Sequence, residues 1–320
     1  MPAEIVELLR SSPVLFAGLV FLFGLLIGSF LNVVIYRLPV MMERDWRKQC
    51  AELAGQDAAA PTTSKGGVSA LGSTRDKSKE PAFNLVTPRS RCPACQAPIH
   101  AWQNIPVVSY LWLRGRCASC KTKISARYPL VELATATLSA IVAWHFGFGW
   151  AALGGLLFTW YLIALSGIDI DHQLLPDSLT LSLLWLGLMA SLFHTGSDSG
   201  FSIPVDPRSS IIGAVGGYLS LWLVFHLFKL ITGKEGMGFG DFKLFAAFGA
   251  WFGWQMLPMI ILLSAFTGAA IGIVLIVLRR RGREVPIPFG PYLAAAGWIA
   301  LLWGPQIVDR YLHMAGMRGM

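Results

Sequence analysis

The chain alternates between long apolar runs and shorter polar stretches. The first run covers residues 13–36 and is interrupted only by Ser29 and Asn32. About 20 helical residues cross the hydrocarbon core of a bilayer, which is about 30 Å thick, so this run predicts a transmembrane helix. Comparable runs follow at about 129–146, 150–168, 178–194, 211–232, 244–256, 257–279 and 288–305. The pattern predicts an all-α polytopic membrane protein with about eight transmembrane helices.

The composition excludes an ordinary soluble domain. Hydrophobic residues make up 54% of the 320-residue chain, charged residues make up 14%, and the mean hydropathy is +0.57. Soluble domains carry about 25% charged residues. The 12 Trp, 19 Phe and five Cys also exclude a disordered chain and a disulfide scaffold.

The positive charge of the chain is concentrated in one polar block. The net charge is +8, and residues 37–128 hold 15 Lys/Arg against 6 Asp/Glu, a net of +9. Such a block is compatible with nucleic-acid binding. The better explanation is topological, because cytoplasmic loops of membrane proteins collect Lys and Arg. We therefore expect the bilayer as a partner and no nucleic acid.

The same charge bias predicts the orientation. The flank before residue 13 is slightly acidic and the flank after residue 36 is basic, which places the N-terminus outside and residue 37 onward in the cytoplasm. The first helix then reads as a retained anchor rather than a cleaved signal peptide. Eight crossings return the C-terminus to the outside. Segments 169–177, 232–241 and 279–283 are then cytoplasmic, and loop 194–210 is outside.

These predictions divide the chain into three parts. Residues 1–36 form a membrane anchor helix, and residues 37–128 form a basic cytoplasmic loop domain. Within that loop, residues 54–80 are rich in small and polar residues and predict a flexible insertion. Residues 129–320 form a seven-helix membrane domain.

Four cysteines in the basic loop have the spacing of a metal site. Cys92 and Cys95 form one C-x2-C pair, and Cys117 and Cys120 form a second pair after 21 residues. Two such pairs can close a tetrahedral structural zinc site with no open position. A cytoplasmic location disfavours disulfides, and a thioredoxin-like redox pair would need a βαβ context. Gly115 and Arg116 suit a tight turn beside the second pair, and Cys50 is left over as a free thiol.

Acidic residues beside membrane helices are candidates for function because they are costly there. Asp169, Asp171 and Asp177 lie at the turn after the third run, and Asp241 opens the sixth run. Two carboxyl groups on separate helices can share a proton, so that one acts as general base and the other polarises a carbonyl. The alternative is that these acids merely hydrate helix ends. For Glu132, inside the second run, pairing with a basic group near a helix end is favoured over catalysis.

Several motifs together resemble one family. The sequence GFGD at 238–241 resembles the G-x-G-D signature of intramembrane aspartyl proteases, and its glycines permit a close turn before Asp241. The sequence DIDHQLLPD at 169–177 resembles the D-x5-L-P-D segment of bacterial type IV prepilin leader peptidases. The two C-x2-C pairs match the zinc loop of that family. Further matches are GSFLNVV at 28–34, NIPVVSY at 104–110 and YPLVEL at 128–133. The resemblance runs from about residue 13 to the C-terminus, apart from 54–80 and 195–210.

The resemblance implies a bifunctional enzyme of the inner membrane. It would cleave the leader of type IV prepilins and type II secretion pseudopilins after a glycine, on the cytoplasmic side. It would then methylate the new N-terminal residue with S-adenosyl-L-methionine. Carried onto this chain, the catalytic pair is Asp169 and Asp241, with Asp171 and Asp177 as competitors and Asp177 at the start of the next helix. For the methyl donor, the zinc loop and residues 28–32 are the candidate regions.

Two other classes of function remain open from the sequence. A non-catalytic membrane scaffold with a zinc knuckle would explain the charge and the cysteines but leaves the two acidic motifs without a role. An ion-coupled transporter could use Gly- and Asp-containing broken helices. The four acids map to one interface, and no inverted repeat is evident in the sequence, which disfavours the transporter.

Overall fold

A computed structural model describes residues 2–57, 83–92, 94–194, 205–234, 236–279, 288–314 and 316. Within these ranges every regular element is a helix, with two isolated β-bridges beside the cysteines. Three predicted features lie partly outside the described residues: the 54–80 insertion beyond residue 57, the outer loop at 195–204, and the basic cluster beyond residue 279.

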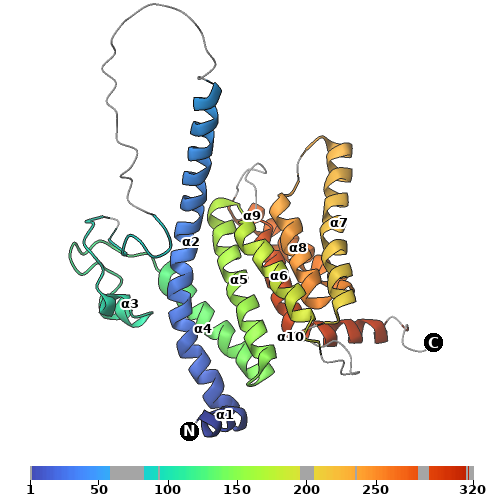
Figure 1. Cartoon of the computed structure of the whole chain (residues 1–320), viewed down its shortest axis with the longest axis horizontal. Coiled ribbons are helices and arrows are strands. Elements are labelled where there is room, and N and C mark those ends of the chain that lie inside the picture. Colours follow the sequence, from blue (N-terminus) through green and yellow to red (C-terminus); the bar gives the residue numbers. More distant parts are fainter. Residues whose placement is uncertain are drawn as a thin grey trace, which may run out of the picture.

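Each predicted apolar run coincides with a helix of the structure (Figure 1). The α-helices are α1 (Pro2–Ser11), α2 (Pro13–Asp57), α3 (Val108–Trp112), α4 (Arg127–Phe146), α5 (Trp150–His172), α6 (Asp177–Ser191), α7 (Pro207–Thr232), α8 (Phe239–Phe252), α9 (Leu257–Arg279) and α10 (Gly290–Met314). Two short 3-10 helices lie at Ala101–Asn104 and Trp254–Met256.

The helices confirm that this is a membrane protein, but they do not establish how many times the chain crosses the membrane. Among the described residues, five helical segments are long and apolar enough to cross a membrane: Pro13–Ala54, Arg127–Phe146, Trp150–His172, Pro207–Thr232 and Trp254–Val274. Helices α6 and α8, with 15 and 14 residues, are shorter than a typical crossing helix of about 20 residues. The count of eight therefore stays a prediction.

Helix α2 is longer than a membrane crossing requires. It has 45 residues and continues through Pro39, so that at about 1.5 Å per residue it is more than twice as long as a bilayer core is thick. Figure 1 shows its C-terminal end projecting beyond the other helices. Its membrane part packs tightly against α4, because a Cβ on Gly24 would lie 2.7 Å from the Cα of Ala136. Small residues allow such close approach of helices.

The core of the bundle forms around α8. Phe158 of α5 is fully buried, and its ring lies 5.2 Å from that of Trp251 and 5.1 Å from that of Phe252, both near the end of α8. The indole N–H of Trp251 donates to the carbonyl of Leu183 in α6 at 2.9 Å. These contacts fix the register of α5 and α6 against α8.

Candidate active site and metal centre

The packing of α5 against α8 brings two acids to the same end of the bundle. Asp169 lies eleven residues after Phe158, and Asp241 lies eleven residues before Phe252. Since Phe158 and Phe252 are in ring contact, an antiparallel pair of helices places both acids at one level. Asp169 is in the last turn of α5 and Asp241 in the first turn of α8, and their side chains interact electrostatically.

Both carboxyl groups are buried but have different surroundings. Asp169 is 6% exposed, and its Oδ2 accepts the backbone N–H of Gly290, the first residue of α10, at 3.0 Å. Asp241 is 7% exposed, and among the described residues its Oδ1 has no hydrogen-bond partner. A buried polar oxygen without a partner costs about 1–3 kcal/mol. Such an oxygen is a candidate contact for a water or a substrate group.

Close packing requires glycine at Gly240 of the acidic motif and at Gly290, the first residue of α10. Leu175, in the α5–α6 turn, lies against both Gly240 and Gly290: added Cβ atoms there would lie 2.7 Å from its Cβ and 3.3 Å from its Cδ2. A Cβ on Gly290 would also lie 2.6 Å from Asp169 Oδ2. Gly238 has a φ of −83°, which other residues also adopt. The meeting of three elements at the two acids therefore explains Gly240, whereas a Cβ on Gly238 would have its nearest contact at 3.7 Å, an ordinary van der Waals distance.

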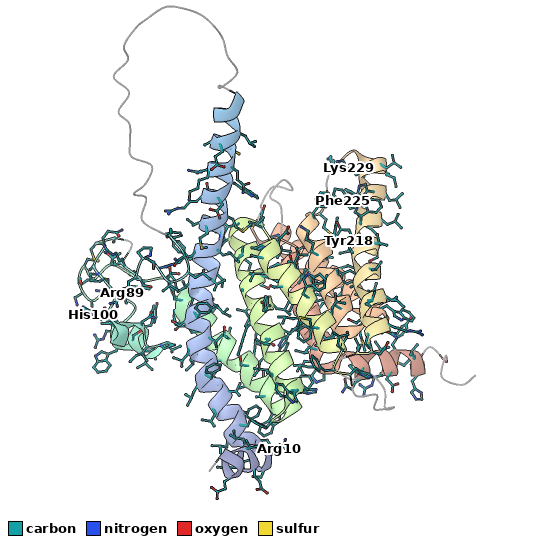
Figure 2. The ribbon with its side chains drawn as sticks, viewed as in Figure 1. Arg10, Arg89, His100, Tyr218, Phe225 and Lys229 are labelled. Atoms are coloured by element: carbon teal, nitrogen blue, oxygen red, sulfur yellow. The ribbon has the colours of Figure 1, made fainter. Side chains whose placement is uncertain are left out.

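Aromatic side chains hold the first turn of α8 against α7. The rings of Phe225 and Tyr218, both in α7, lie 5.6 Å and 6.0 Å from that of Phe242. Phe239 lies 5.4 Å from both Phe225 and Phe242. Tyr218 and Phe225 lie on the side of α7 that faces α8 (Figure 2). This cluster positions the turn that carries Asp241.

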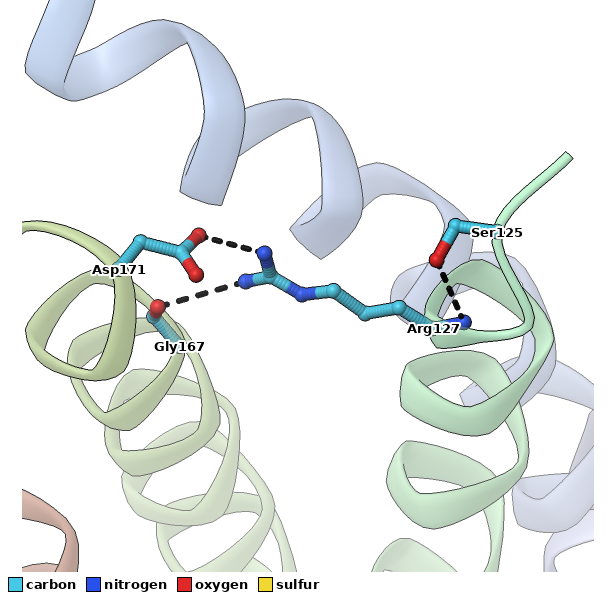
Figure 3. Close-up of polar contacts among 4 residues, drawn as sticks. All are labelled: Ser125, Arg127, Gly167 and Asp171. Atoms are coloured by element: carbon cyan, nitrogen blue, oxygen red, sulfur yellow. Dashed lines mark hydrogen bonds and ion pairs between the residues drawn. The ribbon is translucent and has the colours of Figure 1, made fainter. Parts of the chain in front are cut away.

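The other two acids of the sequence prediction are ion-paired. Asp171 Oδ2 lies 2.6 Å from Nη1 of Arg127, and Nη2 of Arg127 donates to the carbonyl of Gly167 at 3.4 Å (Figure 3). Asp177 begins α6, as predicted, and its Oδ1 lies 2.5 Å from Lys243 Nζ. Both side chains are more exposed than Asp169 and Asp241. The structure thus divides the four acids into a buried pair and two charge-compensated residues.

Glu132 has a backbone partner where a basic group was expected. Its Oε2 accepts the N–H of Val107 at 2.8 Å, and its side chain also interacts with Ser29. Glu132 is buried in α4, and a Cβ on Gly28 of α2 would lie 2.6 Å from its Cα. The acid therefore connects α4 to the segment before α3.

The four cysteines come together in one cluster, as predicted. Their Sγ atoms all lie within 4.8 Å of one another, and those of Cys92 and Cys120 are 3.8 Å apart. Four metal–sulfur bonds of about 2.3 Å in a tetrahedron give sulfur–sulfur distances of about 3.8 Å. The donor set therefore fits a tetrahedral metal ion such as zinc. Cys50 is exposed in α2 and is not part of this cluster.

The two halves of the cluster repeat the same turn. Gln96 N–H donates to the Cys92 carbonyl at 2.9 Å, and Lys121 N–H donates to the Cys117 carbonyl at 3.1 Å. Gln96 and Lys121 have φ values of 58° and 59°. The sequence pattern predicted a tight turn at Gly115, which has a φ of 66°, but the turns at Gln96 and Lys121 were not predicted. The signal was their shared position directly after each C-x2-C pair.

One thiol of the cluster has surroundings that favour its ionised, thiolate form. The hydroxyl of Thr122 lies 3.3 Å from Cys120 Sγ. Hydrogen bonds from the side chain and then the backbone of Thr122 lower the pKa of Cys120 to about 6. At neutral pH this cysteine is therefore mostly thiolate, the form that binds metal.

Arg37 attaches the loop that carries the four cysteines to α2. It is 7% exposed, and its guanidinium donates to the carbonyls of Asn84, Leu85 and Pro88 at 2.9, 3.3 and 2.6 Å. From the sequence, Arg37 was predicted only to contribute to the positive charge that sets the topology. Its role in fixing the loop depends on residues about fifty positions away, which no local pattern reveals.

The fold and these two sites define a class: a polytopic membrane protein with a buried pair of carboxyl groups and a cluster of four cysteines that could hold a metal ion. Comparison with known proteins is more specific. Residues 22–146 match the bacterial Peptidase A24 N-terminal domain, and residues 156–273 match the type IV leader peptidase family. The chain belongs to the type IV leader peptidase family. No solved structure matches the chain.

Curated relatives cover nearly the whole chain. A prepilin leader peptidase/N-methyltransferase of Pseudomonas aeruginosa is 54% identical over 98% of this chain and 99% of its own length. A protein of the same name from Aeromonas hydrophila is 53% identical over 97% of this chain and 98% of its own length. Another, from Neisseria gonorrhoeae, is 52% identical over 86% of this chain and 86% of its own length. The resemblance inferred from the motifs is confirmed.

Proposed function

We propose that this protein cleaves the leader from type IV prepilins and type II secretion pseudopilins after a glycine, and then N-methylates the new N-terminal residue. Family membership and the names of the relatives support both activities. The proposed catalytic pair is Asp169 and Asp241. The observation that carries this assignment is that these two acids are buried together, whereas Asp171 and Asp177 are ion-paired.

In the proposed mechanism Asp169 is the general base. Its Oδ2 accepts the N–H of Gly290 at the N-terminal end of α10, where the helix dipole stabilises negative charge. Asp241 carries the shared proton, because an ionised oxygen buried without a partner is costly. Asp169 removes a proton from water, and the water oxygen attacks the scissile carbonyl carbon. Asp241 meanwhile donates its proton to the carbonyl oxygen as negative charge develops there. When the tetrahedral intermediate collapses, Asp241 takes this proton back, Asp169 gives its proton to the amine nitrogen, and the carbon–nitrogen bond breaks.

The proposed topology has eight crossings and both termini in the periplasm, in the bacterial inner membrane. The acidic pair and the cysteine cluster then lie on the cytoplasmic side. The excess of basic residues in 37–128 supports this orientation. We retain the division into 1–36, 37–128 and 129–320, with α2 joining the first two parts as one continuous helix. The metal in the cysteine cluster is zinc with a structural role, because four thiolates complete its coordination.

Methylation follows cleavage because cleavage creates its acceptor. Hydrolysis after glycine releases the α-amine of the next residue. S-adenosyl-L-methionine would supply an electrophilic methyl group to that nitrogen, with S-adenosyl-L-homocysteine as the leaving group and loss of one proton from the nitrogen. The proposed order is therefore leader removal first and methyl transfer second.

The function is tested with purified full-length protein in lipid nanodiscs and a full-length prepilin. Mass spectrometry should show loss of the leader without a methyl donor, and one added methyl group when S-adenosyl-L-methionine is present. A prepilin with the glycine before the cleavage site replaced by a bulky residue is the control and should stay intact. If zinc-loaded protein leaves the native prepilin uncleaved, the proposal is wrong, and a scaffold or transporter is favoured.

Gly290→Ala should impair cleavage while preserving the fold. The added Cβ would lie 2.6 Å from Asp169 Oδ2, so the carboxyl group must move off its hydrogen bond. We expect kcat to fall at least about tenfold, which corresponds to ~1.4 kcal/mol of transition-state stabilisation. Gly216→Ala is the matched control, because nothing lies within 4 Å of its added Cβ. Equal kcat values for the two variants would contradict the packing argument.

A further inference from the structure

The segment before and including α3 lies beside the membrane part of the molecule. Val107 N–H donates to Glu132, which is more than one turn into α4. Glu132 packs in turn against Gly28 of α2. Gly28 lies eight residues before Tyr36, the end of the predicted first crossing. At 1.5 Å per residue, Gly28 lies about 12 Å inside that end. Glu132 lies three residues, or about 4.5 Å, inside the start of the second predicted crossing at residue 129, so Val107 lies just inside the bilayer.

Helix α3 exposes large apolar side chains at this depth. None of its residues is buried, and Leu111 and Trp112 are 69% and 80% exposed. Ile105 and Val108 are also exposed. Figure 1 shows α3 on the side of α2 that faces away from the helix bundle. Tryptophan is enriched where proteins meet the membrane interface.

The backbone of this segment is paired well enough to enter an apolar environment. Irregular backbone at membrane depth is tolerated only where its polar groups are satisfied. Val107 has a φ of 58° and lies just before α3, where helix N–H groups lack partners, and the carboxyl group of Glu132 accepts its N–H. The next turn is closed by bonds from Ser109 N to Ile105 O and from Leu111 N to Val107 O, at 3.1 and 3.0 Å.

The charges that follow α3 complement an anionic lipid surface. Residues 105–127 contain five basic residues and no acidic one. The basic residues are Arg114, Arg116, Lys121, Lys123 and Arg127. Basic clusters next to a membrane-embedded segment are attracted by anionic headgroups.

We propose that residues 105–112 dock into the lipid bilayer, in the leaflet on the side of the cysteine cluster, and that Glu132 permits this by accepting the N–H of Val107. The inference rests on the crossings of α2 and α4 in the proposed topology. It gives the intramembrane acid Glu132 a positioning role rather than a catalytic one. An anionic bilayer covers the exposed apolar side chains of residues 105–112.

The test is photo-crosslinking of full-length protein in nanodiscs that contain phosphatidylglycerol. A benzophenone amino acid is introduced at Leu111 and, as a control, at Trp46, which is also exposed but lies ten residues beyond Tyr36 on α2. Mass spectrometry should find lipid adducts at position 111 and few at position 46. Adducts with a second copy of the chain, or equally few lipid adducts at both positions, would overturn the proposal.

Variants of Glu132 test its positioning role. Glu132→Leu leaves Val107 N–H without an acceptor, so lipid adducts at position 111 should fall about tenfold, the cost of one unsatisfied buried amide. Glu132→Gln keeps an acceptor oxygen and should retain most of the adducts, with unchanged metal content. Equal loss in both variants would contradict this role. Asp241→Asn should keep the adducts, so a failure of the docking inference is distinguishable from a failure of the proposed catalysis.

Discussion

Replacing Asp241 by Asn is expected to lower kcat/KM for prepilin cleavage at least about 1,000-fold, the scale seen when one member of a catalytic group is removed. The asparagine side chain fills the same space, so the packing of α8 is preserved. It cannot hold and return the proton that the proposed mechanism requires. Asp169→Asn should have an effect of the same size, because an amide cannot act as general base. The measurement is single-turnover cleavage of a full-length prepilin by purified protein.

The matched controls are the two ion-paired acids. Asp171→Asn and Asp177→Asn remove partly exposed ion pairs with Arg127 and Lys243, which are worth little by themselves. Their activity should stay within about tenfold of that of the parent protein. Near-parental cleavage by the Asp241→Asn protein would refute the assignment of the pair. Methylation of a pre-cleaved pilin by that variant would show that the two activities use separable sites.

Removal of the metal is expected to unfold the cysteine loop. Structural zinc contributes about 10–16 kcal/mol to the folding of zinc-finger peptides, far more than the few hydrogen bonds of these turns can supply. Cys120→Ser should therefore lose the bound zinc, and residues 83–127 should become susceptible to limited proteolysis. Zinc content is measured by inductively coupled plasma mass spectrometry, and cleavage sites are mapped by mass spectrometry.

Cys50→Ser is the control for the metal site, because Cys50 is exposed and outside the cluster. It should keep one zinc per chain and the proteolysis pattern of the parent protein. Retention of stoichiometric zinc by Cys120→Ser would contradict four-cysteine coordination.

Local patterns in the sequence predicted the eight apolar helices α2 and α4 to α10 and the cysteine cluster, but not α1 or α3. An apolar run long enough to cross a membrane specifies a helix by itself, because the backbone satisfies its polar groups within the run. The spacing of two C-x2-C pairs likewise predicts a four-sulfur site, and the Sγ atoms lie within 4.8 Å of one another. The extension of α2 to Asp57 was not predicted, because polar helical residues carry no apolar run.

Tertiary packing decided how the acids differ. Asp169 and Asp171 lie two residues apart on one helix, so neither composition nor spacing distinguishes them. Packing of α5 against α8 buries Asp169 beside Asp241, while Asp171 faces Arg127 of α4. The hydrogen bond from Gly290 comes from 121 residues away. A sequence pattern records which residues neighbour one another along a helix, whereas burial and charge compensation depend on which helices meet, and only the folded chain determines that.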